Sequence, residues 1–134
     1  MEIHYTNEIP SADCIFALYD TVGWNDYLML PKELLYKALV QSWHVICAYD
    51  QDRLIGKGRI VSDGVINAYI CGLVVHPDYQ NQGIGSEMIR KLVEKGRESK
   101  LHIQLLCTEE NIPYYNKLGF EGFAMGMKDK NAPL

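Results

Sequence analysis

Residues 68–86 constrain the fold more than any other part of the chain. A short apolar run, 68–75, is closed by Pro77 and is followed by a polar loop and by Gly83-Ile84-Gly85. Such a run is typical of a buried strand. After the loop, apolar side chains recur at helical spacing and charged side chains take the opposite face. The sequence therefore predicts a strand over 68–75, then a loop, then a helix over 83–97.

Three of the first four residues of this predicted helix, 83–86, are small and uncharged. The first four N–H groups of a helix have no partner within the helix, and the helix dipole places partial positive charge there. Small side chains leave these N–H groups open to an incoming anion. The pattern therefore indicates a site for a phosphate or pyrophosphate group.

Two familiar phosphate-binding loops do not fit this segment. The P-loop requires Lys-Ser or Lys-Thr after its last glycine, whereas Gly85 is followed by Ser86. The dinucleotide fingerprint requires a third glycine, where Met88 stands, and an acidic residue about twenty positions later, near the run 103–106, which holds none. A nucleotide-phosphate domain of another fold is therefore disfavoured. What remains is Gln-x-x-Gly-x-Gly, from Gln80 to the second glycine.

A second motif lies near the end of the chain, where 111–120 reads Asn-Ile-Pro-Tyr-Tyr-Asn-Lys-Leu-Gly-Phe. Pro113 suits the first turn of a helix and Gly119 suits the position just past its end. Gln80–Gly85 resembles the acyl-CoA pyrophosphate loop of the GNAT superfamily of N-acyltransferases, and 111–120 is similar to the aromatic-Tyr-x-x-x-Gly-Phe segment of that superfamily. One helix and one strand fit between the two motifs, as the family requires. The resemblance covers residues 53–123 well and the rest loosely.

The resemblance implies a GNAT-type N-acetyltransferase that uses acetyl-CoA as a co-substrate and needs no metal. It implies that the acetyl group passes to a primary amine of a small molecule or peptide by direct attack in a ternary complex. The alternative is a non-catalytic acyl-CoA-binding sensor, which would share the loop but need no catalytic tyrosine or proton route. The implied fold class is α/β (α+β), with a mixed, mostly antiparallel central sheet and helices on both faces.

The family's site residues can be carried onto matching positions of this chain. The backbone N–H of Leu73 matches the oxyanion donor freed by a strand bulge, and Val75 matches the residue that pairs with the pantetheine amides; ordinary strand bonding is the alternative for both. Tyr115 matches the tyrosine that protonates the leaving thiolate, with packing against the sheet as its alternative. Asn111 is equally suited to cap the following helix or to bond the cofactor. The residues expected to bind acetyl-CoA are Leu73, Val74, Val75, Gln80, Asn81, Gln82, Gly83, Ile84, Gly85, Ser86 and Asn111.

The general base is missing from the place where some relatives carry it. Those relatives have Glu or His in the strand before the phosphate loop, and the matching positions here hold Tyr69 and Cys71. Neither is a good base at neutral pH without a shifted pKa. A water chain to a backbone carbonyl or to Tyr69 is the fallback. A covalent acyl intermediate on Cys71 is disfavoured, because strand cysteines are usually inert.

Other charged and basic residues near this region are expected to be structural. Arg53, Lys57 and Arg59 alternate along a predicted strand over 53–61 and are interpreted as a solvated strand face. His76 follows the strand that ends at residue 75, and it is expected to position the loop or to face solvent.

Length and composition are those of a small globular protein. The chain has 134 residues, so 1–134 is expected to form a single N-acetyltransferase domain. A formal net charge of −4 argues against a nucleic-acid-binding surface. No apolar run approaches the length that spans a bilayer and the N-terminus lacks the features of a signal peptide, so we expect a cytoplasmic protein with no membrane partner. The four cysteines form no Cys-x-x-Cys pair, which argues against a zinc site and a disulfide framework.

The rest of the chain is expected to complete the same fold. Residues 23–27 are expected to form a loop. Because an unpaired sheet edge can pair with a second copy, the strands expected at the end of the chain also predict a homodimer. The remaining predicted elements are a strand near 3–5, helices over 12–22 and 31–42, strands over 43–49 and 102–107, a helix over 112–118, and strands over 120–127.

Overall fold

The computed structural model describes residues 2–132. Within this range, five strands form one sheet in the order β1-β2-β3-β4-β5, antiparallel except for the parallel pair β4–β5. The strands are β1 (His4–Thr6), β2 (His44–Asp50), β3 (Arg53–Ser62), β4 (Asn67–Val75) and β5 (His102–Gln104). The helices are α1 (Ala12–Thr21), α2 (Asn25–Leu28), α3 (Lys32–Val40), α4 (Ile84–Glu98) and α5 (Ile112–Lys117), with short 3-10 turns at Pro77–Tyr79 and Glu109–Asn111. The mixed, mostly antiparallel sheet that the resemblance implies is confirmed.

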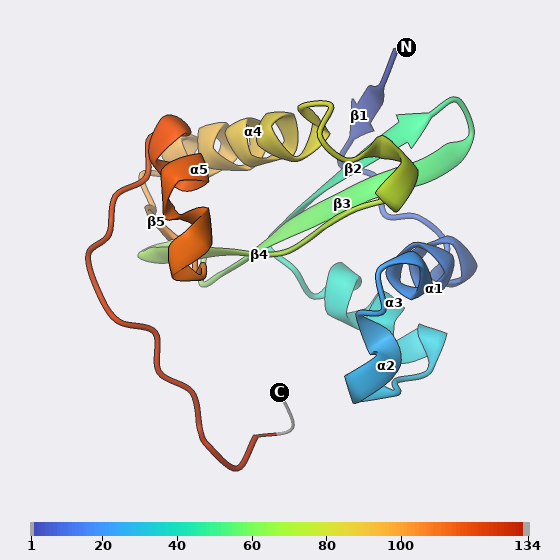
Figure 1. The fold of residues 1–134 in the computed structure, drawn as a ribbon, viewed down its shortest axis with the longest axis horizontal. Helices are drawn as coiled ribbons and strands as arrows, with labels where there is room; N and C mark the ends of the chain where they lie inside the picture. The colour runs from blue at the N-terminus through green and yellow to red at the C-terminus, as the bar shows by residue number, and fades with distance from the viewer. Residues whose placement is uncertain (1, 133–134) are drawn as a thin grey trace.

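Each face of the sheet carries its own apolar core. Helices α1 to α3 lie on one face, whereas α4 and α5 lie on the other (Figure 1). The core under α4 includes Ile46, Ala48, Ile55, Ile60, Ile84, Met88 and Leu92. The core under α1 and α3 includes Ile15, Leu18, Leu35, Leu39, Val45, Cys47 and Val74. The central strands are therefore covered on both sides, which explains the buried apolar run over 45–48 in β2.

Helix α4 packs closely onto β3 because that strand presents glycines to it. A Cβ added at Gly56 would lie 3.2 Å from the Met88 Cε atom, and one added at Gly58 would lie 3.3 Å from Leu92 Cδ1. Close packing fixes the start of α4 relative to the neighbouring strands. No helix within residues 2–132 is long and apolar enough to cross a membrane.

Residues 23–27, between α1 and α3, were expected to form a loop, and that expectation is wrong for 25–27. Residues 25–28 form the short helix α2. The Asn25 side chain closes this turn, because its amide donates to the Leu30 carbonyl at 2.8 Å and its side-chain oxygen accepts from the Leu30 N–H at 3.0 Å. The local hydrogen bonds of an asparagine therefore produced a helical turn where the composition indicated a loop.

The strands expected over 120–127 are also absent from the described part of the chain. From Phe120 onward the segment runs away from the sheet as an extended loop (Figure 1). Strand β5 spans three residues rather than the six expected, so it offers a short edge for pairing. Glycines at positions 122 and 126 further weaken the strand tendency of this segment.

Candidate active site

Strand β4 contains a bulge at Gly72 and Leu73. The β3–β4 register runs from the pair Lys57–Val74 to the pair Arg59–Cys71, so two residues of β4 stand opposite one residue of β3. Gly72 has φ +65°, a conformation that side-chain-bearing residues rarely adopt. A bulge removes its residues from regular ladder pairing, which agrees with the position predicted for the oxyanion donor.

The other edge of β4 is open beyond its first residues. Strand β5 pairs with β4 at positions 67–69 and not, within the described residues, at 70–75. The pairing of the two parallel strands therefore ends before the bulge, which lies on the unpaired part of β4. Backbone N–H and C=O groups along an open edge can bond an extended ligand in the manner of an added strand.

The loop that follows β4 ends in an exposed helix start. Gly83 occupies the N-cap position of α4 with φ +83° and provides no side-chain cap, and a Cβ placed on it would meet no atom within 4 Å. A Cβ on Gly85 would lie 3.6 Å from the Tyr114 hydroxyl and 3.8 Å from Val75. The first N–H groups of α4 thus border free space, as an anion-binding helix start requires.

A cavity of about 500 Å³ lies over this helix start. Its wall is formed by Val75, Tyr79, Gln80, Asn81, Gly83, Ile84, Gly85, Ser86, Asn111 and Tyr114. Most of the residues predicted to bind the co-substrate are therefore brought together. Leu73, Val74 and Gln82 are not part of the wall, and the Val74 side chain is buried in the core beneath α1.

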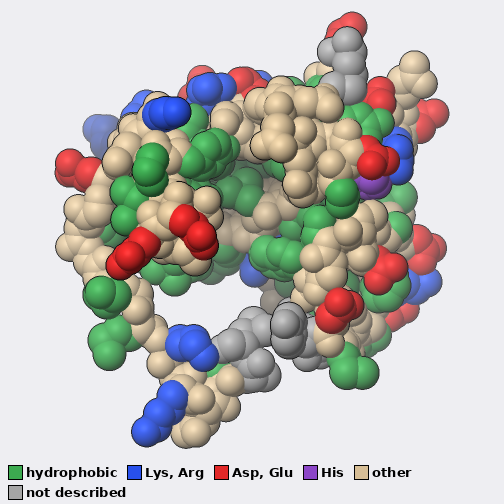
Figure 2. Space-filling model, in the orientation of Figure 1, with side chains coloured by type: hydrophobic (Ala, Val, Ile, Leu, Met, Phe, Trp, Pro, Cys, Tyr) green, Lys and Arg blue, Asp and Glu red, His purple; other side chains and the backbone are tan. Residues whose placement is uncertain are grey.

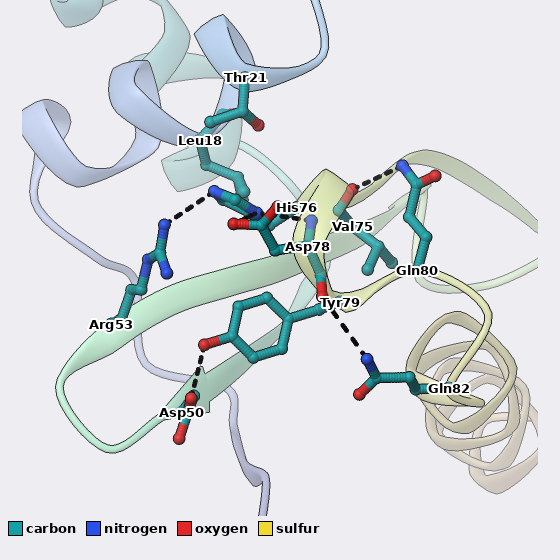
Figure 3. Close-up of polar contacts among 10 residues, drawn as sticks. All are labelled: Leu18, Thr21, Asp50, Arg53, Val75, His76, Asp78, Tyr79, Gln80 and Gln82. Carbon is teal, nitrogen blue, oxygen red and sulfur yellow. Dashed lines mark hydrogen bonds and ion pairs between the residues drawn. The ribbon is translucent and has the colours of Figure 1, made fainter.

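Several side chains fix the conformation of the loop between β4 and α4 (Figure 3). The Tyr79 hydroxyl donates to Asp50 at 2.5 Å, and the Gln80 amide donates to the Val75 carbonyl at 3.1 Å. The His76 ring lies 3.0 Å from the Asp78 N–H through Nδ1 and 2.9 Å from Arg53 through Nε2. A neutral imidazole has one acceptor nitrogen, so one of these two contacts is a full hydrogen bond. His76 therefore positions the loop, which is one of the two roles expected for it.

The two neighbouring tyrosines of α5 occupy different environments. The Tyr114 hydroxyl lies 2.8 Å from Ser86 Oγ and faces the cavity. Tyr115 is half-buried, with its ring edge-on to Phe120 at 6.1 Å between centroids. Burial, and then the neighbouring Tyr114, raise the pKa of Tyr115, so it is protonated at neutral pH. The sequence motif singled out Tyr115 and gave no signal for the contact of Tyr114 with the loop.

Asn111 does not cap α5 through its side chain. It occupies the N-cap position, but its amide donates to Thr108 Oγ1 at 3.3 Å and makes no capping bond. Of its two expected roles, capping the helix is therefore wrong. A contact with the co-substrate stays a prediction, and the place of Asn111 on the cavity wall is compatible with it.

Lys57 is not part of a solvated strand face, and that expectation is wrong. It is 0% exposed and points toward α1, where Nζ donates to the Tyr19 hydroxyl and lies 4.5 Å from the centre of the Tyr19 ring and 5.7 Å from that of Trp24. Burial, and next the charge of Arg59, lower the pKa of Lys57 to about 7. Gly56 and Gly58 face α4, so the alternation of the strand places the Lys57 side chain on the other face, and only the structure shows that α1 covers this face.

Tyr69 and Cys71, the two groups at the positions where relatives carry a base, are poorly suited to accept a proton. Burial raises the pKa of Tyr69, and Cys71 is partly buried on the strand. All four cysteines are free thiols. Among residues 2–132, no group of histidine, cysteine and carboxylate side chains is arranged to hold a metal ion.

A larger cavity of about 870 Å³ lies on the opposite side of the sheet, among α1, α2 and the start of α3. It contains none of the residues predicted from the motifs. Its wall includes the acidic residues Asp20, Asp26 and Glu33, the basic residue Lys32, and Phe16. The two cavities therefore lie on opposite sides of the sheet.

Comparison with known proteins places this geometry among acetyltransferases. Residues 10–120 match the profile described as the Acetyltransferase (GNAT) family. Histone acetyltransferase TAP1 of Glycine max is 35% identical over 121 residues, which cover 84% of this chain and 52% of that protein. Uncharacterized N-acetyltransferase ycf52 of Porphyra purpurea is 33% identical over 108 residues, which cover 77% of this chain and 60% of that protein. The chain thus spans between half and two thirds of the length of these relatives.

Solved structures agree over almost the whole chain. SA2161, a probable acetyltransferase from meticillin-resistant Staphylococcus aureus, superposes with a TM-score of 0.79 at 27% identity, covering 96% of this chain and 99% of that one. The GNAT family protein SP0256 from Streptococcus pneumoniae superposes with a TM-score of 0.74 at 28% identity, covering 97% and 100%.

Proposed function

The chain belongs to the GNAT acetyltransferase family, and from that premise we propose that it transfers the acetyl group of acetyl-CoA to a primary amine of a small molecule or peptide by direct attack. The observation that carries the proposal is the bulge at Gly72 and Leu73, on an open strand edge that leads directly into the exposed start of α4. One continuous segment thereby offers a place for a reacting carbonyl and a place for phosphates.

The start of α4 fits the pyrophosphate of CoA. The N–H groups that follow Gly83 carry partial positive charge and border free space. Ser86 and Tyr114 add hydroxyl groups beside the same cavity. Gln80 and Asn81 line its rim, so polar contacts surround the position where a phosphate would bind.

The bulge fits the thioester end of the co-substrate, which supplies an activated acetyl group. The N–H of Leu73 is the proposed oxyanion donor, and one such donor is worth about 3 kcal/mol of transition-state stabilisation. The backbone of Val75 is proposed to bond the pantetheine amides along the open edge. Gln80 already donates to the Val75 carbonyl, which has a second lone pair available for a ligand.

Tyr115 is proposed to protonate the leaving thiolate. Its raised pKa keeps the phenol protonated at neutral pH, as a general acid requires. Tyr115 is not on the cavity wall, and the assignment rests on its place in the sequence motif and on its protonated phenol.

The acceptor is proposed to approach from the side of α1 to α3. An alkyl ammonium with a pKa near ~10.4 must lose a proton before it attacks, which costs roughly 4–5 kcal/mol at pH 7. The wall of the cavity on this side carries three acidic residues and one basic residue, Lys32, and this acidic excess can attract a cationic amine. The soybean relative named as a histone acetyltransferase makes a peptide amine one acceptor to test, beside small amines.

A panel of small amines and basic peptides tests the proposal. Each amine is incubated with the protein and acetyl-CoA, CoA release is measured, and the acetylated product is identified by mass spectrometry. We expect acceptor-dependent release for at least one class of amine, with no product on hydroxyl analogues. Saturable binding of acetyl-CoA without transfer to any amine would instead support the non-catalytic sensor.

We also propose that the protein is a homodimer, formed through its C-terminal segment. Phe123, Met125 and Met127 are exposed and alternate along the segment, as in a strand with one apolar face. Figure 2 shows open space between part of this segment and the body of the protein. In light scattering, the wild-type protein should be a dimer, and the double variant Phe123→Asp/Met125→Asp should be a monomer. A monomeric wild type at micromolar concentration would contradict this proposal.

A further inference from the structure

Lys57 is a buried titratable group that the reaction proposed above does not use. Its side chain projects from the middle of β3 toward α1 and is completely shielded from solvent. A Cβ added at Gly72 would lie 2.8 Å from Nζ and 3.4 Å from Arg59 Nε. The Lys57 amine therefore lies directly against the β4 bulge, one residue before the N–H of Leu73.

The groups that face Lys57 come from four elements. They are Tyr19 on α1, Cys47 on β2, Arg59 on β3 and Cys71 on β4. None is a carboxylate, and Lys57 makes no ion pair with any residue from 2 to 132. Burial raises the pKa of both Tyr19 and Cys47 to about 12, so both are protonated near neutral pH.

These surroundings favour the neutral form of the lysine. A buried amine without a counter-ion loses its proton more easily than one in water, and the fixed charge of Arg59 acts in the same direction. Both effects place the pKa of Lys57 at about 7. A base with a pKa near the working pH is largely free to accept a proton and still basic enough to hold it.

We propose that neutral Lys57 is the general base that removes a proton from the acceptor's ammonium group at the β4 bulge. This proposal rests on the acetyl transfer proposed above. It fills the role for which Tyr69 and Cys71 are poorly suited. Of the other groups that face Lys57, Arg59 is permanently cationic, and burial keeps Tyr19 and Cys47 protonated.

The step balances in protons and electrons. One acceptor N–H bond breaks as an N–H bond forms on Nζ of Lys57, and the freed lone pair attacks the thioester carbonyl carbon. The C–S bond then breaks, the sulfur leaves with the bonding electron pair, and the attacking nitrogen loses its second proton. Of the two protons released, one ends on the CoA sulfur and the other passes from Lys57 to solvent.

The acceptor must displace part of the aromatic cover to reach Lys57. Tyr19 is 6% exposed, whereas Trp24 is 44% exposed, so Trp24 is the member of this cover that meets solvent. Its ring lies 5.7 Å from that of Tyr19 and 5.7 Å from Nζ. We place the route of the acceptor past the Trp24 ring, next to the cavity among α1, α2 and α3.

The test is the pH dependence of kcat/KM for wild type and Lys57→Met, with an acceptor identified by the amine panel. For wild type we expect kcat/KM to rise up to about pH 7 and then to level off until the acceptor itself deprotonates. Lys57→Met should be about 100- to 1,000-fold slower at pH 7 and should gain roughly tenfold per pH unit up to about pH 10, because only amine that is already free can react. Its affinity for acetyl-CoA should be unchanged.

Three further measurements keep the test decisive. Lys95→Met, an exposed lysine on α4, is the matched control and should follow wild type. Arg59→Met should move the wild-type rise to higher pH, because removing its charge raises the pKa of Lys57. NMR of ¹⁵N-labelled lysine should show one Nζ that titrates near pH 7 in wild type and is absent from Lys57→Met.

The outcomes separate this inference from the proposed function. Wild type that releases CoA with an amine while Lys57→Met keeps the same rate and the same pH profile overturns the role of Lys57 and leaves acetyl transfer intact. Wild type that transfers to no amine at any pH overturns acetyl transfer itself. If Lys57→Met does not fold, two other results would refute the role of Lys57 as general base. They are a pH profile that does not change in Arg59→Met and the absence of any lysine Nζ signal that titrates below pH 9.

Discussion

The two sides of β4 are built in different ways. The region where β4 leads into the start of α4 is open and consists mainly of backbone, with Gly83 bordering free space and the strand edge unpaired beyond position 69 in the described residues. The side toward α1 is closed, and Lys57 lies there fully buried beneath Tyr19 and Trp24. The proposed donor site thus depends on small residues and helix geometry, whereas the proposed acceptor site depends on one side chain in an unusual environment.

This difference determines how each side responds to substitution. A backbone site is insensitive to most side-chain changes but fails when a bulky or charged group enters its space. A buried amine site loses its chemistry with a single substitution, even one that preserves packing. Changes on the donor side should therefore affect acetyl-CoA binding, and changes on the acceptor side should affect the pH dependence of turnover.

The largest effect is expected for Gly83→Asp and Gly85→Asp. Each places a negative charge where the pyrophosphate would bind, and the first also strains a backbone with φ +83°. We expect acetyl-CoA affinity to fall at least about 100-fold, or roughly 2.7 kcal/mol, in calorimetric titration. Gly122→Asp is the matched control, because a Cβ added there also meets open space and Gly122 is not part of the cavity wall. Unchanged affinity in both loop variants would contradict the proposal that the start of α4 binds the pyrophosphate.

Tyr115→Phe should lower turnover by about 10- to 1,000-fold, consistent with the loss of a general acid. The ring and its contact with Phe120 remain, so stability should change little. Tyr114→Phe is the internal comparison. It loses the contact with Ser86 and should raise the KM for acetyl-CoA a few-fold with kcat nearly constant. Equal kcat for wild type and Tyr115→Phe would make Tyr115 a packing residue.

Lys57→Met should be more stable than wild type at neutral pH. The folded-state pKa of Lys57 is about 7, below the ordinary value of 10.5, so the unfolded chain binds more protons between these two values. Wild-type stability should therefore rise with pH in this window by up to roughly 1.4 kcal/mol per unit relative to the variant. Urea denaturation at pH 7, 8 and 9 measures the difference. Parallel stability curves would mean that Lys57 is charged in the folded protein.

The smallest effect is expected for Tyr79→Phe. The variant removes the hydrogen bond to Asp50 that fastens the loop, while the ring stays in place. We expect a few-fold weaker affinity for acetyl-CoA and no change in the pH profile. An effect as large as that of Gly83→Asp would show that the conformation of the loop, rather than its open N–H groups, controls binding.

The donor side could be predicted from sequence because its determinants are local. Gly83 and Gly85 lie at fixed positions after an apolar strand, and the strand and helix formed within one or two residues of the expected bounds. The position of Leu73 at a bulge was available only from the resemblance, and the register of β3 against β4 agrees with it.

The acceptor side could not be predicted because burial there is a tertiary property. Periodicity showed that Lys57 shares a strand face with Arg59, but a solvated face and a face covered by α1 have the same local pattern. The C-terminal strands failed for the same reason, since Phe123 and Met125 alternate like strand residues, yet pairing depends on an available edge.

A crystal structure with acetyl-CoA, or with a non-hydrolysable thioester analogue, tests most directly whether the β4 bulge is the centre of the reaction. The thioester oxygen should lie within hydrogen-bond reach of the Leu73 N–H, about 2.7–3.1 Å. The carbonyl carbon should lie between that N–H and the side of the sheet that holds Lys57, with the phosphates at the start of α4. A thioester that points into solvent, or that lies away from Gly72 and Leu73, would contradict both the site and the role of Lys57.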